Sequence, residues 1–332
     1  MNIYPIQEPN AIQLEPTEGC TLACAFCGIA TIRENGADRK SMTHGTLGSG
    51  PYRFMSLATV ERIAREMSRL KWGSRIEIAM HGEPTMNVDL PEMIACLRHY
   101  LPKNYILVTS NGAGITKRDR FMRLLKSGLN TLALDDYRHA DNVAKIREFL
   151  PTIGFPVYAY PEQKEGNPHV RDANRVKVTI IHDISDNTAG THKLHNQGGS
   201  SGGPSEELRN QRCTKPFREL SVRWDGNVAL CCDDWPGKYK IGNVLSMPLD
   251  KLWASEPFEA ARRKLYAGQR DFGPCRGCNV PANRPGLLPD KAGKHTMPLP
   301  DAEGDKVIAQ ALAGLPYTPK LLKRSTPKVS EA

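Results

Sequence analysis

The chain has 332 residues, of which 39% are hydrophobic and 24% are charged, a composition that predicts a globular protein with one large domain or two ordinary ones. Its first residues, MNIYPIQEPN, do not form a basic segment followed by an apolar one, and no apolar run approaches the roughly 20 residues that span a bilayer. We therefore expect no membrane association and a cytoplasmic location, in a cell or in an infected host. The net charge of +9 favours a polyanionic partner such as nucleic acid, although a basic surface also serves solubility alone.

Strand-like and helix-like segments alternate through the first half of the chain. Hydrophobic patterning predicts strands over 11–17, 75–80, 105–110, 130–136, 155–160 and 175–184. It predicts helices over 56–71, 90–101, 117–128 and 141–150, the first of them capped by Ser56. This alternation is typical of a parallel sheet, open or curled into a barrel, with its chemistry in loops at the carboxyl ends of the strands.

The composition changes near residues 187–211, where a Gly/Ser-rich segment predicts a linker or flexible loop. Two alternating runs over 219–232 flank Asp225-Gly226 and predict a hairpin, and a helix is expected over 248–268. The tail is rich in Pro and Lys, with one short helix expected near 303–313. We predict three units, at 1–200, 201–285 and 286–332, the last of them a basic, flexible tail.

The nine cysteines are grouped, and without a secretion signal this grouping favours metal sites over disulfides. Cys20, Cys24 and Cys27 follow the first predicted strand with the spacing C-x3-C-x2-C. Iron–sulfur clusters usually take four protein ligands, so three cysteines leave one coordination position for another molecule.

This spacing, with the aromatic Phe26 before the last cysteine, resembles the radical S-adenosylmethionine (radical SAM) superfamily. The resemblance implies a partial (β/α)6 TIM-like barrel and a [4Fe–4S] cluster on the three cysteines, with SAM at the fourth iron. It further implies that the reduced cluster cleaves SAM to a 5′-deoxyadenosyl radical, which abstracts a hydrogen atom from substrate. An electron donor such as flavodoxin or ferredoxin is then a partner.

A second motif, HGEPT, directly follows the second predicted strand. It resembles the Gly-Gly-Glu-Pro motif of the same superfamily, which implies that Gly82, Glu83 and Pro84 bind the amino group of SAM. A buried ammonium needs acceptors, and Glu83 with the turn carbonyls can supply them. His81 replaces the first glycine of that motif.

Two later strand ends carry further candidates. The segment TSNG ends the third strand, where the resemblance implies that Ser110 and Asn111 face SAM, although Asn-Gly is also a common turn. Asp135 follows the fourth strand, where the superfamily often places a polar contact to the ribose. Ala133 stands in place of the more usual serine there.

The remaining grouped cysteines resemble the auxiliary-cluster module called SPASM, in its shortened "twitch" form. The pattern is C-x12-G-x4-C followed by a distant C-x2-C, and it implies that Cys213, Cys231, Cys275 and Cys278 saturate a second [4Fe–4S] cluster. Cys232 is an alternative to Cys231, and a four-cysteine zinc site is the alternative to a cluster.

Three substrate classes remain open. The positive charge favours rearrangement or oxidation of a nucleotide or modified nucleobase, for example by an isomerase acting on the hypermodified thymidine of phage DNA, with DNA or a nucleotide as partner. Peptide maturation is common among SPASM enzymes, but only 19 residues precede Cys20, which counts against a leader-binding domain. A single auxiliary cluster suits dehydrogenation of a small alcohol or sugar. An iron–sulfur or zinc redox module without enzymatic activity would leave the Gly-Glu-Pro motif unexplained.

Overall fold

The computed structural model describes residues 8–22, 24, 27–29, 52–137, 140–160, 176–181, 197–200, 212–237 and 239–280. Phe26, most of the predicted linker and the whole of the predicted tail lie outside these residues. Within them, no helix combines the length and apolar character that crossing a membrane requires.

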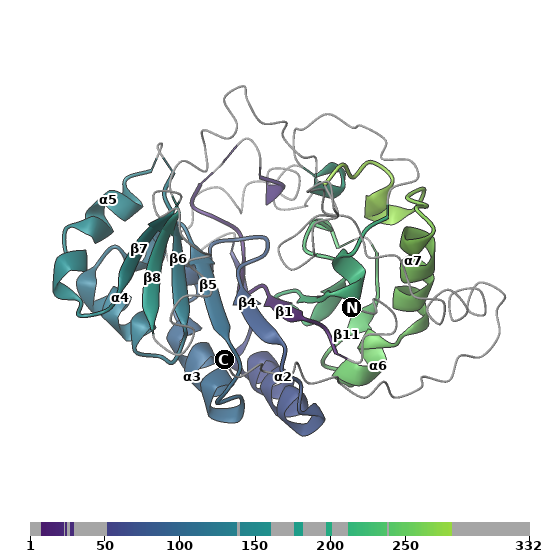
Figure 1. Ribbon diagram of the computed structural model, residues 1–332, viewed down its shortest axis with the longest axis horizontal. Helices are drawn as coiled ribbons and strands as arrows, with labels where there is room; N and C mark the ends of the chain where they lie inside the picture. Colours follow the sequence, from purple (N-terminus) through teal and green to yellow (C-terminus); the bar gives the residue numbers. More distant parts are fainter. Residues whose placement is uncertain are drawn as a thin grey trace, which may run out of the picture.

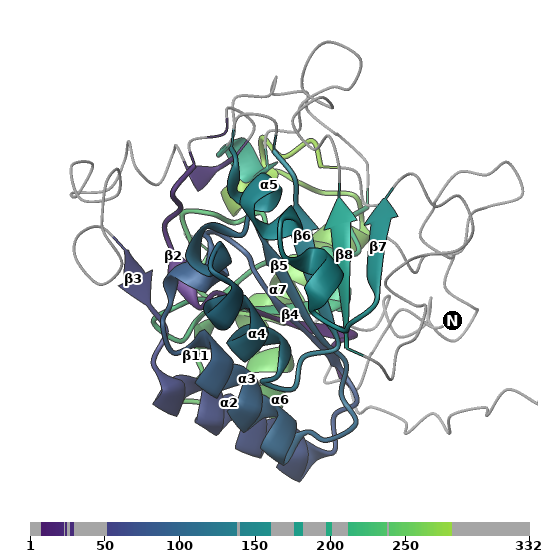
Figure 2. The same ribbon diagram turned by 90° about the vertical axis from the view of Figure 1, so that its left-hand side faces the viewer.

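One nine-stranded sheet runs through the molecule, in the order β11-β10-β9-β1-β4-β5-β6-β8-β7 (Figure 1). Seven of its strands are mutually parallel, and six of these correspond to the six strands predicted in the first half of the chain. These six are β1 (Ala11–Leu14), β4 (Arg75–Ile78), β5 (Ile106–Ser110), β6 (Thr131–Asp135), β7 (Val157–Tyr160) and β8 (Lys177–Ile181). The arrowheads of β7 and β8 point upward in Figure 2, so the carboxyl ends of the parallel strands lie at that edge.

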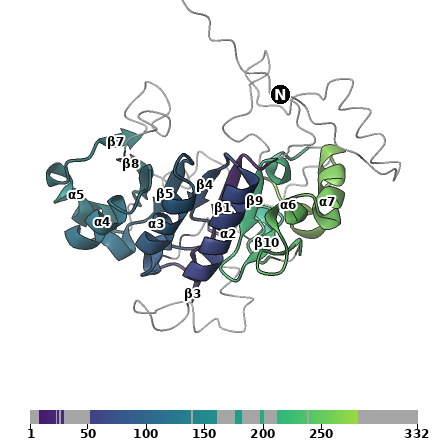
Figure 3. The same cartoon turned by 90° about the horizontal axis from the view of Figure 1, so that it is seen from below.

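Helices cover one face of this parallel sheet, and the sheet curves in the view from below (Figure 3). They are α2 (Leu57–Leu70), α3 (Leu90–Tyr100), α4 (Arg118–Leu125) and α5 (Asn142–Arg147). The predicted cap of the first helix is confirmed, because the Ser56 side chain accepts a hydrogen bond from the backbone N–H of Thr59. Parallel strands covered by helices in an open, curved sheet are the partial barrel that the sequence predicts.

The order of the last two strands differs from the order along the chain. β8 lies between β6 and β7, with Thr131 of β6 opposite Lys177 of β8 and Val157 of β7 opposite Val178. The segment after β7 therefore returns to insert its strand beside β6. Strand periodicity predicts that both strands exist, but it carries no information on which neighbour each one takes.

The second half of the chain extends the same sheet on its other side. Its strands are β9 (Glu219–Val222), β10 (Asn227–Ala229) and β11 (Gly242–Asn243). β9 pairs in parallel with β1, with Ala11 opposite Glu219, and the predicted hairpin then folds β10 back antiparallel to β9. Figure 1 accordingly shows β1 at the centre of the molecule, between α3 and α4 on one side and α7 on the other.

The single helix predicted over 248–268 is wrong, because two helices stand there. They are α6 (Leu249–Trp253) and α7 (Glu256–Tyr266). Ser255 has an extended backbone at the N-cap of α7, and Pro257 occupies the first turn, which it could not do inside a continuous helix.

Short elements complete the described parts of the chain. A two-stranded sheet pairs β2 (Thr17–Glu18) with β3 (Arg53–Phe54) beside the first cysteine. The short 3-10 helices are η1 (Pro84–Met86), η2 (Ala113–Ile115), η3 (Leu150–Thr152), η5 (Gln197–Gly199), η6 (Lys215–Phe217) and η7 (Gly273–Cys275). η1 and η2 follow β4 and β5, so both lie at the carboxyl edge of the sheet.

Candidate active site

The three-cysteine loop begins where β2 ends, at the carboxyl edge of the sheet. The backbone N–H of Cys27 donates to the carbonyl of Cys24 at 3.0 Å, which closes a tight turn between these two cysteines. The Cys20 sulfur accepts hydrogen bonds from the Leu22 backbone N–H at 3.4 Å and from the Asn111 amide at 3.3 Å. Asn111 is therefore brought to the cysteine loop, as its place after the third predicted strand suggests.

The Cys20 thiol lies in surroundings that disfavour a bare negative charge. Burial first, then the charges of Glu83, Cys27 and Cys24, raise the pKa of Cys20 to about 12, against a lowering hydrogen bond from the Leu22 backbone. Three thiolates beside a buried carboxylate need a positive group among them. An iron–sulfur cluster supplies that charge and takes thiolate ligands, so this donor set fits a cluster.

Gly82 allows the motif after β4 to lie against the cysteine loop. It forms a parallel bridge with Gly19, and the Glu83 backbone N–H donates to the Gly19 carbonyl at 2.8 Å. A Cβ atom on Gly82 would lie 2.2 Å from the Thr17 carbonyl oxygen and 2.5 Å from that of Gly19. Only glycine fits here, which gives a physical reason for the glycine that the motif contains.

Glu83 is buried and its carboxylate accepts hydrogen bonds at both oxygens. Oε1 accepts from the Ser110 hydroxyl at 2.6 Å and from the hydroxyl and backbone N–H of Thr85 at 2.5 and 3.0 Å. Oε2 accepts from the Asn111 backbone N–H at 2.7 Å. Burial raises the pKa of Glu83, while the hydrogen bonds from Ser110 and Thr85 lower it. The structure thus brings Glu83, Ser110 and Asn111 together, with Pro84 starting η1 beside them.

Asp135 ends β6 and faces the same region. Burial, followed by the charge of Glu83, raises the pKa of its carboxyl to about 7. The Tyr137 hydroxyl donates to Asp135 at 3.5 Å, and the pKa of Tyr137 is raised by burial and then by the charges of Asp135 and the three cysteines. Tyr137 was not predicted from the sequence, because it lies beyond the strand end and carries no motif.

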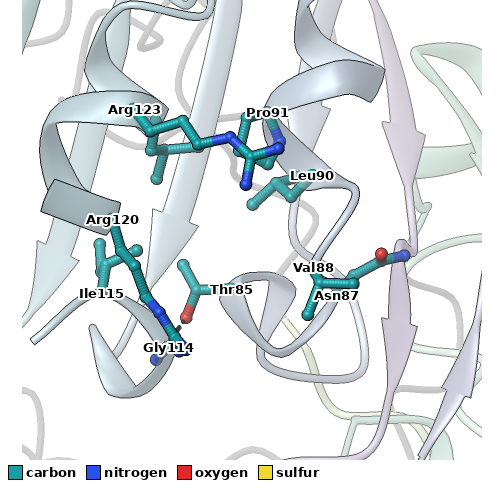
Figure 4. Close-up of a pocket in the computed structure, with 10 residues that line it drawn as sticks. Thr85, Asn87, Val88, Leu90, Pro91, Gly114, Ile115, Arg120 and Arg123 are labelled. Atoms are coloured by element: carbon teal, nitrogen blue, oxygen red, sulfur yellow. Dashed lines mark hydrogen bonds between the residues drawn. The ribbon is translucent and has the colours of Figure 1, made fainter. Parts of the chain in front are cut away.

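A pocket opens on the outer side of Glu83, between the beginnings of α3 and α4 (Figure 4). Thr85 separates the pocket from the carboxylate, since its hydroxyl donates to Glu83 and accepts from the Gly114 backbone N–H at 2.9 Å. Arg120 and Arg123 of α4 line the pocket, and Arg123 forms an ion pair with Glu92. The pocket is adjacent to the Gly-Glu-Pro motif, but none of the site residues predicted from the sequence lines it.

The four cysteines predicted for an auxiliary cluster line one pocket in the second half of the chain. Its lining includes Cys213, Cys231, Cys275 and Cys278. Cys275 ends η7, and the Cys278 backbone N–H donates to its carbonyl at 3.2 Å. Burial raises the pKa of Cys213, Cys231 and Cys275, so these thiols also need a cationic centre in order to ionise. Arg270 lines the same pocket and donates to the Cys278 carbonyl at 3.2 Å. The donor set fits a saturated cluster.

Cys232 lies outside this lining. Its sulfur accepts from the Lys215 ammonium at 3.2 Å, and Lys215 also pairs with Asp233. The geometry therefore favours Cys231 over Cys232 as the ligand, in agreement with the spacing that the sequence predicts. Lys215 is buried and its role has no signal in the sequence.

Among the described residues, no three His, Cys, Asp or Glu side chains converge closely enough to bind one metal ion. A cluster differs from a single ion in this respect, because its cysteines bind separate irons at the corners of a cube.

A buried polar network joins the two cysteine regions. His81, with no exposed surface, hydrogen-bonds through Nδ1 to Glu15 at 2.8 Å and through Nε2 to the Cys232 carbonyl at 2.9 Å. Arg223, which follows β9, pairs with Glu15 and with Glu18. In the sequence His81 is only a departure from a motif, whereas the structure gives it contacts in both halves of the molecule.

Comparison with family models agrees with this geometry. The model of the radical SAM superfamily matches residues 14–135, and the SPASM iron–sulfur cluster-binding domain matches residues 213–279. The chain is a radical SAM enzyme with a C-terminal SPASM domain. Its cofactors are accordingly SAM, the [4Fe–4S] cluster of the radical SAM domain and auxiliary iron–sulfur of the SPASM domain.

Two curated proteins illustrate its relatives. The S-adenosyl-L-methionine-dependent 2-deoxy-scyllo-inosamine dehydrogenase of Niallia circulans is 24% identical over 274 residues, which cover 81% of this chain and 92% of that protein. GTP 3′,8-cyclase of Pectobacterium atrosepticum is 23% identical over 43% of this chain and 40% of its own length.

Solved structures support the fold. BtrN in complex with AdoMet and 2-DOIA superposes with a TM-score of 0.59 at 20% identity, over 82% of this chain and 94% of that one. An open conformation of BtrN gives a TM-score of 0.54 at 18% identity, over 82% of this chain and 93% of that one.

Proposed function

We propose that this enzyme dehydrogenates a small polar substrate at a carbon that bears a hydroxyl or amino group. When bound, the reduced cluster and SAM together supply the radical that abstracts hydrogen from that carbon. An auxiliary cluster held by Cys213, Cys231, Cys275 and Cys278 would accept the residual electron, and the hydroxyl or ammonium proton would be released. The overall change in the substrate is the loss of two hydrogen atoms.

The observation that carries this proposal is the single pocket lined by Cys213, Cys231, Cys275 and Cys278. Four thiolates saturate a [4Fe–4S] cluster, so its irons have no position for a substrate and electron transfer is the chemistry left to it. The dehydrogenase of Niallia circulans, whose length the chain covers almost fully, supports the same reaction class.

We assign the cofactor-binding roles as follows. Cys20, Cys24 and Cys27 hold the cluster that binds SAM, and Cys213, Cys231, Cys275 and Cys278 hold the auxiliary one. The residues proposed to bind SAM are Phe26, Gly82, Glu83, Pro84, Ser110, Asn111 and Asp135. Glu83 accepts a hydrogen bond from the SAM ammonium. The Ser110 hydroxyl and the Asn111 backbone N–H fix the orientation of the Glu83 carboxylate through their hydrogen bonds to it.

An external one-electron donor, such as flavodoxin or ferredoxin, reduces the cluster that binds SAM. We also assign the chain to the cytoplasm, where reduced thiols persist. We also propose domain limits at residues 200 and 285.

A nucleotide isomerase is the second candidate, and the net charge of +9 is the observation that favours it. Its substrate would be a nucleotide or a modified base in DNA, such as hypermodified thymidine. The substrate radical would then rearrange and regain hydrogen, so the product would keep the mass of the substrate.

One experiment separates the two reactions. The anaerobically reconstituted enzyme is incubated with SAM, reductant and each of three substrates: 2-deoxy-scyllo-inosamine, a thymidine nucleotide and DNA. Mass spectrometry then shows whether a product has lost two hydrogens with one SAM consumed for each turnover, as dehydrogenation requires. A nucleotide or DNA product of unchanged mass would overturn the dehydrogenase proposal and establish the isomerase.

A further inference from the structure

One indole side chain of the SPASM domain lies against the cysteine loop of the radical SAM domain. Trp235 packs on Ile29 and Cys27, in a small apolar cluster separate from the main core. The indole covers Gly28 so closely that a Cβ atom there would lie 2.5 Å from the ring. A glycine directly after Cys27 is therefore what lets the indole approach the loop.

The same indole also contacts His81. The two ring centroids are 4.5 Å apart with an interplanar angle of 39°. The Nε2 atom of His81 reaches the Cys232 carbonyl at 2.9 Å, and Cys232 is bonded through its peptide to Cys231. The path from Cys27 to Cys231 thus consists of ring contacts, one hydrogen bond and covalent bonds.

Several contacts hold these two rings in place. The Trp235 carbonyl accepts from Arg223 at 2.8 Å, and Arg223 is paired with Glu15 and Glu18. Glu15 also binds Nδ1 of His81. Since a carbonyl can only accept, Nε2 of His81 carries a hydrogen and the orientation of the ring is fixed from both ends.

The indole nitrogen is a further unusual feature. Trp235 is 7% exposed, and its Nε1 atom is buried without a hydrogen-bond partner among the residues that the structure describes. An unsatisfied buried N–H costs about 1–3 kcal/mol. A buried N–H group left without a partner calls for an explanation, such as a redox role or a group that binds beside it.

We propose that Trp235 and His81 form the path by which one electron returns from the auxiliary site to the SAM-binding site. The inference rests on the proposed dehydrogenation. In each turnover SAM takes one electron from the first cluster and the substrate radical gives one to the second. Passage of that electron through the two rings restores both clusters, so one external reduction supports many turnovers.

The test measures electron exchange between the clusters of the holoenzyme without any substrate. A photoreductant injects one electron per molecule in a flash, and rapid-freeze EPR follows how quickly the electron redistributes between the two cluster signals. Trp235→Leu removes the ring, while Trp235→Phe keeps an aromatic ring at the same place. Trp224→Phe is the matched control, because that indole donates to Glu18 outside the path.

We expect Trp235→Leu to slow the exchange at least severalfold, with both clusters loaded and both midpoint potentials unchanged. Trp235→Phe and Trp224→Phe should stay near the wild-type rate. A wild-type rate in a fully loaded Trp235→Leu enzyme would overturn the proposal, as would equal slowing in Trp224→Phe.

A second variant keeps the test decisive if Trp235→Leu fails to hold its iron. His81→Gln interrupts the other half of the path and should slow exchange to a similar extent, whereas an unchanged rate would overturn the proposal. The exchange test contains no substrate, so its result does not depend on which reaction the enzyme catalyses. If the proposed dehydrogenation is wrong, only the product analysis by mass spectrometry will show it.

Discussion

At the scale of single residues, the site depends on close packing between the cysteine loop and the Gly-Glu-Pro motif. Gly82 is the tightest point, because any side chain there meets the Thr17 and Gly19 carbonyls. We expect Gly82→Ala to displace Glu83, to weaken SAM binding and to destabilise the fold by about 1–3 kcal/mol. Thermal unfolding and SAM binding, measured together, check this. Gly73→Ala is the matched control, because Gly73 has no positive φ and its Cβ would meet only the Glu8 carboxylate, at 3.9 Å.

The charge of Glu83 is the second prediction at this scale. Glu83→Gln preserves the shape of the side chain and the acceptor for Ser110, but it loses the acceptor for the Asn111 backbone N–H and the charge that attracts an ammonium. Charged hydrogen bonds contribute about 1.5–3 kcal/mol, so we expect SAM affinity to fall roughly tenfold to a hundredfold. Equilibrium binding to the reconstituted enzyme measures this change. Unchanged affinity would remove Glu83 from the SAM site.

Asp135 gives a prediction about pH. Its pKa is raised to about 7, so without SAM the carboxyl holds its proton below that pH. SAM brings positive charge and favours the ionised form, so binding releases a proton at low pH and affinity rises as the pH increases through about 7. Calorimetry in buffers of different ionisation enthalpy detects that proton. Asp135→Asn should abolish the pH dependence, and a variant that keeps it would assign the titration to another group.

At the scale of secondary-structure elements, helix α2 offers a local test of the fold. The Ser56 hydroxyl caps its first turn through the Thr59 N–H at 3.1 Å. Ser56→Ala should lower the free energy of unfolding by about 1 kcal/mol without changing cluster content, and Ser56→Asp should largely preserve stability. Chemical denaturation measures both. An equal loss in the two variants would show that the cap is not the source of stability.

Most elements of the barrel half could be predicted from the sequence, because their signals are local. Helical periodicity and a cap define α2, and alternating apolar residues before a motif define β4 and β5. The break between α6 and α7 was missed although Pro257 marks it, because the apolar pattern continues across the break. The exchange of β7 and β8 could not be predicted, since pairing between distant strands depends on tertiary contacts.

The two cysteine groups and the Gly-Glu-Pro motif stand out in the sequence for a related reason, since their spacing is itself the signal. The sequence carries no comparable signal for His81, Trp235 and Tyr137. Each of them interacts with residues that are far away in the chain. His81 departs from the motif, yet it is buried and contacts both halves of the molecule.

At the scale of the whole molecule, the two domains share one sheet. β9 pairs with β1, and the pairs between Arg223 and the two glutamates Glu15 and Glu18 tie the second domain to the strand that leads into the first cysteines. The auxiliary site is therefore held at a fixed position relative to the SAM site. This arrangement suits transfer of an electron over a defined path.

Two separate clusters in one molecule give a stoichiometric prediction. The reconstituted enzyme should contain about eight irons, and replacement of Cys275 and Cys278 by alanine should leave about four. That variant should still cleave SAM, because Cys20, Cys24 and Cys27 are untouched. Loss of all iron from this variant, or zinc in place of four irons in the unmodified enzyme, would contradict the assignment of a separate auxiliary cluster. Cys96→Ala, outside both groups, controls for the removal of a thiol.

The most direct measurement is the fate of SAM in the anaerobic, reduced holoenzyme, compared with a variant in which Cys20, Cys24 and Cys27 are alanine. We predict that the enzyme converts SAM into equal amounts of methionine and 5′-deoxyadenosine, and that the variant forms neither. An iron-loaded enzyme that leaves SAM intact, or a variant that cleaves it equally well, would contradict the account.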